Sequence, residues 1–207
     1  CQNIISKVFE KNNVPEGVSC LVTGNASGDL MNNDKRVPLV SFTGSTRIGR
    51  HVSKKVAERF GKTILELGGN NAIIVSEHAD LSMVLVGAVF GAVGTAGQRC
   101  TSTRRLIVHE SVYTKTIETL KSAYGQLKIG DPLDASNHVG TLIDKKEVED
   151  YLNAIEKAKA EGGNIVVEGG VVTGAGYESG CYVKPCIIEA KNEFEIVQEE
   201  TFAPILY

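Results

Sequence analysis

Short apolar runs alternate with helix-forming segments in the first half of the chain, and this alternation limits the folds open to it. The runs at 37–42, 63–66 and 72–75 have strand length, and apolar residues at every fourth position from Ile48 to Phe60 separate the first two. Strands linked by helices pair in parallel and are covered on both faces, which predicts an α/β fold with a doubly covered parallel sheet. Right-handed crossovers then bring the carboxyl ends of the strands to one edge, where ligands bind in such sheets.

The rest of the chain continues this pattern. Apolar periodicity predicts helices at 2–12, 43–60, 80–93, 111–127 and 144–161, a short helix within 24–33, strands at 18–22 and 103–109, and β-structure from 165 to 188. Asp80 and Ser111 are the expected N-caps, and Gly61 is the expected end of the 43–60 helix. The apolar run from Met83 to Gly94 has 12 residues, whereas a membrane span needs about 20. It therefore predicts a helix that is buried on all sides.

The composition excludes several classes of protein. The 207 residues are 42% apolar and 23% charged, with a formal net charge of −3, which suits a folded chain and disfavours binding to nucleic acid or to a membrane.

The five cysteines have no CxxC spacing and the four histidines have no ligand spacing, so we expect no disulfide framework and no metal site. Reduced thiols predict an intracellular protein, cytoplasmic or mitochondrial. Apolar sequence at both ends, without a start methionine, is typical of a fragment.

Cys100 lies in a small-residue turn, GQRCTS, directly after the apolar helix. Glycine permits tight backbone geometry there and lets a substrate approach closely. A thiol in such a turn is a candidate nucleophile if a neighbouring group takes its proton. The alternative is a cysteine that only packs within the turn, and the hexapeptide alone does not separate the two.

Glu66 stands between two leucines at the end of a predicted strand, in LELGGNNA. An unpaired charge is costly to bury, and burial favours the neutral carboxyl, which is the setting of many general bases. The alternative is a glutamate at a strand end that points to solvent or forms a salt bridge. The double glycine at 68–69 that follows is the best candidate for a domain boundary.

The segment FTGSTRIG, from Phe42 to Gly49, reads as a strand, a small-residue turn and a helix N-terminus. Free backbone N–H groups and the helix dipole make such a turn suitable for a phosphate. It is neither a GxGxxG fingerprint nor a Walker loop, because Arg50 and His51 stand where the latter needs Lys and Ser or Thr. The alternative is a Ser or Thr that only caps the helix.

Taken together, these motifs resemble the aldehyde dehydrogenase superfamily. FTGSTxxG, LELGGNNA and GQRCTS occur in order, with Glu66 and Cys100 34 positions apart, and QEETFAP near the end is similar to the family's EExFGP segment, with Ala203 in place of the usual glycine. The residues within these motifs are most similar to those of the antiquitin branch, which is associated with oxidation of α-aminoadipic semialdehyde in lysine breakdown. The resemblance implies a Rossmann-like NAD-binding domain that ends near residue 68. A catalytic domain would follow over 69–207, incomplete at its end.

The resemblance also implies a role for each matching residue. Cys100 would attack the aldehyde, the backbone N–H of Cys100 would help to hold the oxyanion, and Glu66 would activate the water that hydrolyses the thioester. The NAD-binding residues would be Gly44 and Ser45 at the pyrophosphate, Ile48 at the adenine, Glu200 at the nicotinamide ribose and Phe202 at the nicotinamide.

Arg99, next to the candidate nucleophile, has two open interpretations. In the antiquitin branch an arginine here grips the distal carboxylate of the substrate, for which a planar guanidinium is well suited. The alternative is a structural arginine that donates to loop carbonyls. The resemblance implies a homotetramer for the full protein, and we expect the 207 residues alone to be inactive.

Two further functions stay open at this point. A CoA-acylating semialdehyde dehydrogenase would release the acyl group to a thiol, although Glu66 as a water-activating base argues against it. A structural protein that binds the cofactor on the same fold would not need Cys100 and Glu66 together.

Overall fold

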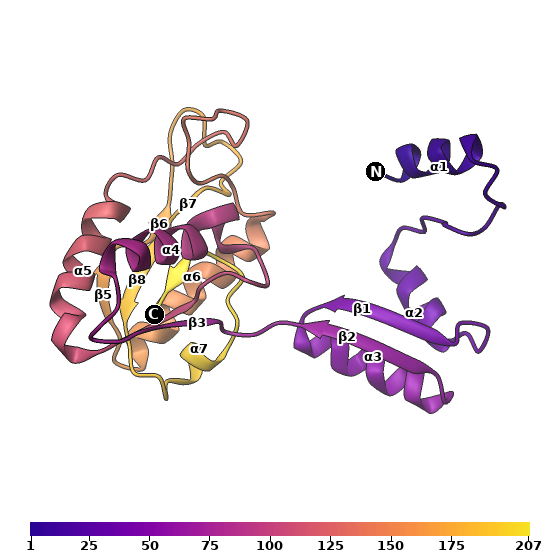
Figure 1. The fold of residues 1–207 in the computed structure, drawn as a ribbon, viewed down its shortest axis with the longest axis horizontal. Helices are drawn as coiled ribbons and strands as arrows, with labels where there is room; N and C mark the ends of the chain where they lie inside the picture. The colour runs from indigo at the N-terminus through magenta and orange to yellow at the C-terminus, as the bar shows by residue number, and fades with distance from the viewer. The chain divides into compact units, whose positions relative to one another are not determined.

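The chain divides between Leu67 and Gly68 into two units, each built from helices and strands (Figure 1). The computed structural model describes the backbone of residues 1–207 and the side chains of residues 1–24 and 26–207. In the described residues, no helix is long and apolar enough to cross a membrane.

The first unit is a parallel pair of strands joined by a helix. Its elements are α1 (Gln2–Lys11), α2 (Asn25–Asn33), β1 (Leu39–Gly44), α3 (Thr46–Glu58) and β2 (Lys62–Leu67). The register of β1 and β2 sets Thr43 beside Glu66. As predicted, the turn after β1 and the end of β2 therefore lie at the same edge of the sheet.

Two predictions for this unit are wrong. Within the described residues, one face of the β1–β2 pair is packed against α3, which buries Val52 and Val56, and the other face leaves Leu39 and Ile64 about half exposed. In addition, residues 18–22 form no strand in the described structure. Their alternation of apolar residues is real, but a strand also needs a partner for its backbone groups, which local sequence does not reveal.

The end of α3 also differs from the prediction. Phe60 has a φ of 60° and occupies the left-handed position expected for Gly61. Gly61 instead donates its N–H to the carbonyl of Val56 at 3.0 Å. A Cβ on Gly61 would come within 2.8 Å of Val56 Cγ1, so the glycine is required for space rather than for its backbone angle.

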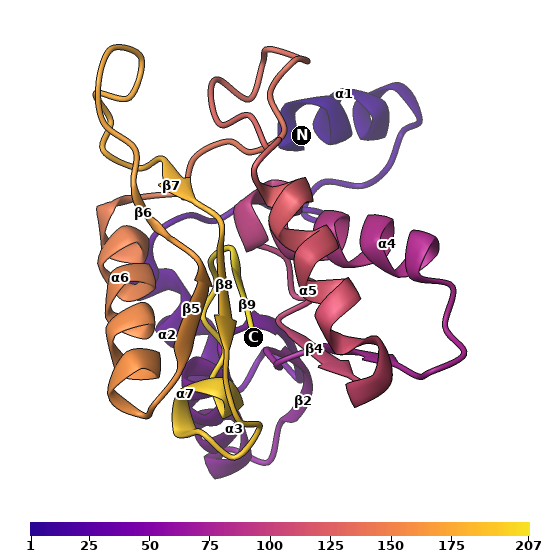
Figure 2. The ribbon, with the colours of Figure 1, turned by 90° about the vertical axis from the view of Figure 1, so that its left-hand side faces the viewer.

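The second unit contains three sheets, two of which meet through the last residue. Its elements are β3 (Ala72–Val75), α4 (Leu81–Val93), η1 (Gly94–Gly97), β4 (Arg105–Val108), α5 (Glu110–Tyr124), α6 (Lys145–Ala160), β5 (Asn164–Val167), β6 (Gly170–Val171), β7 (Val183–Lys184), β8 (Cys186–Glu189), α7 (Glu195–Gln198) and β9 (Ile205–Leu206). β3 pairs with β4 in parallel. β5, β8 and β9 form a mixed sheet, and β6 and β7 form a separate antiparallel pair (Figure 2). Tyr207 joins the first two sheets, because it exchanges backbone hydrogen bonds of 2.8 Å with Arg104 and Leu106.

The core of this unit lies between α6, β8 and the inner face of α4. Tyr151, Ile188 and Ala88 are fully buried in it. Each large aliphatic side chain buried in this way contributes about 1.5–3 kcal/mol. Cys181 and Cys186 are buried here as free thiols.

The apolar helix α4 is not buried on all sides, contrary to the prediction. Met83, Val86 and Phe90 are 72%, 69% and 66% exposed, whereas Ala88 and Ala92 are buried. The large residues are spaced by three and four positions and so share one face. Because both faces of the helix are apolar, hydropathy could not indicate which one packs.

The helix caps follow the sequence in part. Asp80 is the N-cap of α4 and accepts from Ser82 N–H at 2.9 Å, as predicted. Ser111 is not the cap of α5. His109 holds that position and accepts from the N–H of Ser111 at 3.3 Å. Histidine is not among the usual cap residues, so the sequence pattern predicts the N-cap of α5 two residues too late.

Candidate active site

Cys100 follows a tightly wound loop at the end of α4. Thr95, Ala96 and Gly97 are three successive residues with positive φ, of 55°, 51° and 71°. A β-branched threonine is rarely found in this region, so the surrounding contacts must hold the loop in place. The side chain of Gln98 supplies two of these contacts, since it donates to Thr141 O at 3.0 Å and accepts from Ile143 N–H at 2.9 Å.

The side chain of Cys100 is exposed while its backbone is fixed. The amide nitrogen of Asn71 donates to the carbonyl of Cys100 at 2.7 Å and to that of Ser102 at 2.9 Å. Ser102 closes the turn, because its hydroxyl accepts from Arg99 N–H at 3.2 Å. An accessible thiol on a rigid backbone is the arrangement that a nucleophile requires.

The segment from Glu200 to Pro204 packs directly against this loop. A Cβ on Gly97 would lie 2.5 Å from the carbonyl carbon of Ala203, so the two backbones touch. Gly97 is therefore required for two reasons, its left-handed conformation and this contact. The contact brings together GQRCTS and QEETFAP, two of the motifs singled out in the sequence.

Glu200 lies over the double glycine. A Cβ on Gly68 would come within 1.8 Å of Glu200 Oε2, so any larger residue there would displace the carboxylate. Glu200 Oε1 forms a 3.4 Å ion pair with Arg104 Nη2, and the Glu200 side chain is 20% exposed. Phe202 is partly exposed, and its ring centroid lies 5.3 Å from Arg104 Cζ.

Arg104 is the residue that connects these parts, and it is 2% exposed. Its guanidinium donates to the carbonyls of Gly97, Arg99 and Thr201 at 3.1, 3.1 and 2.9 Å. Burial lowers the pKa of Arg104, and Glu200 opposes this shift. Arg104 was not among the residues predicted from the motifs, although an arginine at the start of an apolar strand indicates a charge that needs buried partners.

Arg99 has local partners in this structure. Its Nη2 donates to Phe90 O at 3.1 Å, and its Cζ lies 4.8 Å from the centre of the Phe90 ring. The guanidinium also abuts Gly94, where a Cβ would lie 2.1 Å from Nη2. These contacts match the structural alternative for Arg99, in which it donates to a loop carbonyl.

The turn after β1 belongs to the first unit. Ser45 is the N-cap of α3, and its hydroxyl accepts from Ile48 N–H at 3.3 Å. Helix geometry leaves the N–H groups of Thr46 and Arg47 without helical partners. Gly44 and Ser45 are exposed and Ile48 is half-buried, so this turn can present free N–H groups to an anion.

Glu66 is exposed, and the expectation of a carboxylate buried between leucines is wrong. The burial alternates along β2, so Leu65 and Leu67 turn to one face and Glu66 to the other. Flanking leucines in a strand therefore say little about the residue between them. Cys100 and Glu66 belong to different units of the chain.

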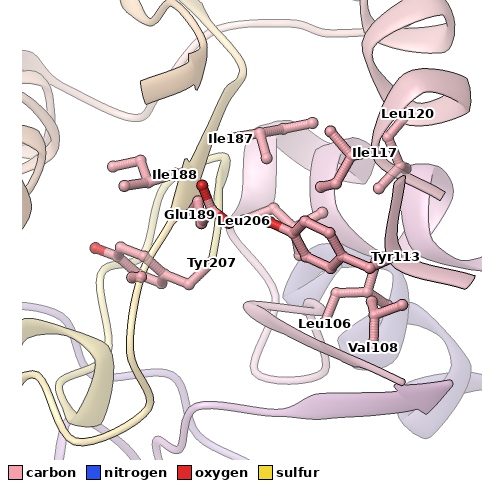
Figure 3. A pocket seen from close by; sticks show the side chains of 11 residues that line it. Leu106, Val108, Tyr113, Ile117, Leu120, Ile187, Ile188, Glu189, Leu206 and Tyr207 are labelled. Carbon is pink, nitrogen blue, oxygen red and sulfur yellow. Dashed lines mark hydrogen bonds between the residues drawn. The ribbon is translucent and has the colours of Figure 1, made fainter. Parts of the chain in front are cut away.

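A cavity of about 150 Å³ lies elsewhere in the second unit, between α5, β4, β8 and β9 (Figure 3). Its walls are mostly aliphatic, and Tyr113 donates to Glu189 Oε1 within it at 2.6 Å. It contains none of the motif residues, so it is not the candidate active site.

Comparison with known proteins identifies the family. The model of the aldehyde dehydrogenase family matches residues 1–207, and the chain belongs to this family. It is 49% identical over 206 residues to alpha-aminoadipic semialdehyde dehydrogenase of Bos taurus, covering 99% of this chain and 38% of that protein. It is 46% identical over 205 residues to aldehyde dehydrogenase family 7 member A1 of Pisum sativum, covering 99% of this chain and 40% of that protein. The chain thus spans about two fifths of the length of these relatives.

The fold comparison agrees. The structure of betaine aldehyde dehydrogenase from Staphylococcus aureus in complex with NAD+ matches with a TM-score of 0.93 and 31% identity, over 98% of this chain and 41% of that chain. HpcC from Thermus thermophilus matches with a TM-score of 0.90 and 30% identity, over 98% of this chain and 41% of that chain. The predicted aldehyde dehydrogenase-like α/β fold is confirmed.

Proposed function

We propose that the whole protein is an NAD-dependent aldehyde dehydrogenase that oxidises an aldehyde to the carboxylic acid through a thiohemiacetal and a thioester on Cys100. The observation that carries the proposal is an exposed Cys100 whose backbone is held by Asn71. In this scheme the Cys100 sulfur attacks the carbonyl carbon. Glu66 later takes a proton from the water that hydrolyses the thioester.

The residues of the chain suit the cofactor. Gly44 and Ser45 would approach the pyrophosphate at the N-terminus of α3, and Ile48 would contact the adenine. Glu200 would accept from the nicotinamide ribose hydroxyls and Phe202 would line the nicotinamide. Among the described residues, Oε2 of Glu200 has no protein donor, which leaves it available for a hydroxyl group. NAD, when bound, supplies the hydride acceptor.

The proposed domain boundary lies one residue from the boundary between the two units. We assign 1–68 to the C-terminal part of the NAD-binding domain and 69–207 to the catalytic domain. The free thiols support a reducing compartment, cytoplasmic or mitochondrial. We propose a homotetramer for the whole protein on the basis of its family.

The proposed substrate class is a semialdehyde with a distal carboxylate, such as α-aminoadipic semialdehyde. The names of the relatives support this choice, and Arg99 would bind the carboxylate. Because Arg99 already donates to Phe90 O through Nη2, the substrate would be bound by the remaining donors of the guanidinium. An Arg99→Met variant should raise KM for the semialdehyde at least tenfold and leave KM for propionaldehyde within twofold.

The experiment that tests this function uses the full-length protein with NAD, aldehyde, and CoA either present or absent. NADH and free acid should form at the same rate in both cases, and Cys100→Ala should form neither. Acyl-CoA as the product would identify the CoA-acylating alternative. No NADH from any aldehyde would favour the non-catalytic, cofactor-binding alternative.

A further inference from the structure

Arg104 occupies a position that the proposed mechanism has not used. Its side chain is 2% exposed, and its two terminal nitrogens donate four hydrogen bonds, two to the loop before Cys100 and two to the Glu200–Thr201 segment. These two segments lie about a hundred positions apart in the sequence. A single planar fork therefore links the candidate nucleophile to the candidate ribose ligand.

The bond to Arg99 O acts on the peptide that contains the Cys100 N–H. A trans peptide is planar, and its C=O and N–H point in opposite directions. Arg104 Nη2 holds this carbonyl at 3.1 Å, and Ser102 N–H adds a second bond of 3.0 Å. The direction of the Cys100 N–H is thereby fixed, and donation to the carbonyl also polarises the N–H.

The loop itself requires such an anchor. Thr95, Ala96 and Gly97 all have positive φ, and the second Arg104 bond on this side ends on the carbonyl of Gly97 at 3.1 Å. A backbone in a sparsely populated conformation persists only where its surroundings over-determine it. Arg104 supplies this restraint from the interior, where water does not compete.

On the other side, Arg104 sets the position of Glu200. The ion pair with Oε1 and the bond to Thr201 O hold the segment in register with the loop. We infer that Arg104 is a positioning residue, which aims the backbone N–H of Cys100 at the oxyanion and the carboxylate of Glu200 at the cofactor ribose. The inference rests on the proposed function and adds to it a residue that touches neither substrate nor cofactor.

The test uses Arg104→Lys in the full-length enzyme. Lysine keeps the charge beside Glu200 but lacks the planar fork, so it cannot hold Arg99 O and Glu200 together. Arg104→Met removes the charge as well. The matched control is Arg105→Lys, because neighbouring Arg105 donates to Asn70 O and to Asn192 Oδ1 and not to the loop or to Glu200.

Three measurements distinguish the loss of positioning by Arg104 from the loss of the folded structure. Alkylation of Cys100 by iodoacetamide involves neither an oxyanion nor the cofactor, and should stay within twofold of wild type in Arg104→Lys. Acylation by p-nitrophenyl acetate forms an oxyanion without the cofactor, and should slow about tenfold, since loss of one oxyanion donor outright costs about 10²–10³-fold. The Kd for NAD should rise about tenfold, and Arg105→Lys should change none of the three.

Two results would overturn the inference. The first is an Arg104→Lys enzyme with acylation and NAD binding both within twofold of wild type. The second is equal loss of alkylation and acylation, which would indicate a collapsed loop. If Arg104→Met fails to fold, the lysine variant still decides. Failure of the proposed function would appear separately, as wild-type enzyme that forms no NADH.

Discussion

The side-chain amide of Asn71 donates to the carbonyl of Cys100 at 2.7 Å. This hydrogen bond connects the LELGGNNA motif directly to the GQRCTS motif. Replacement of Asn71 by alanine should free the carbonyls of Cys100 and Ser102, which are both held by the same amide. We expect kcat to fall about tenfold or more, because the thiol loses its fixed position. The melting temperature and kcat of the full-length variant would check this, and unchanged kcat would contradict it.

Replacement of Gly68 by alanine tests the proposed role of Glu200 as a cofactor ligand. An alanine there would push the carboxylate of Glu200, since the new Cβ would lie 1.8 Å from Oε2. A flexible side-chain end moves at small cost, so the melting temperature should change little while the Kd for NAD rises about tenfold. Gly69→Ala is the matched control, because a Cβ on Gly69 meets nothing within 4 Å. Equal NAD affinity in the two variants would argue against Glu200 as a cofactor ligand.

Gly97→Ala should be strongly destabilising. The residue has a φ of 71°, and a Cβ would lie 2.5 Å from the backbone of Ala203, which cannot move aside as a side chain can. We expect a loss of about 2–4 kcal/mol in the free energy of unfolding, as for other substitutions that combine backbone strain and overpacking. Denaturant unfolding of the variant would measure it. A loss below about 0.5 kcal/mol would mean that the two backbones do not touch.

We expect the free energy of unfolding to depend on alkaline pH through Tyr113. Partial burial and the bond to Glu189 raise the pKa of Tyr113 to about 12, from an ordinary value of 10.0. Between pH 10 and 12 the unfolded chain releases this proton and the folded chain keeps it, so the tyrosine's contribution is full below pH 10 and is lost as the pH rises through 12. The free energy of unfolding should therefore fall more steeply over this window in wild type than in Tyr113→Phe. Parallel curves would refute the assignment.

The sequence predicted local order well where one residue determines it. Asp80 caps α4 because a carboxylate satisfies free N–H groups, and β3 follows its apolar run over Ala72–Val75. It failed where the outcome depends on distant partners. Nothing near 18–22 shows that this stretch finds no partner strand among the described residues, and nothing in the apolar helix 80–93 distinguishes the face of Ala88 from that of Phe90.

The candidate site shows the same limit. Cys100, Glu200 and Phe202 were found from motifs, and the role of each stays a prediction. Asn71 and Arg104 were missed, since their importance comes from carbonyls that the fold brings to them from 29 and 97 positions away. Glu66 was expected to be buried because its neighbours are leucines, but alternation along β2 exposes it.

The most direct measurement of the central claim is rapid mixing of the full-length Glu66→Gln variant with aldehyde and excess NAD, with NADH followed by absorbance. If Cys100 carries the acyl group and Glu66 activates the water, each active site should release about one NADH in a fast burst. Turnover should then be at least a hundredfold slower than in wild type, and Cys100→Ala should show no burst. Steady turnover without a burst, within a few fold of the wild-type rate, would contradict the account.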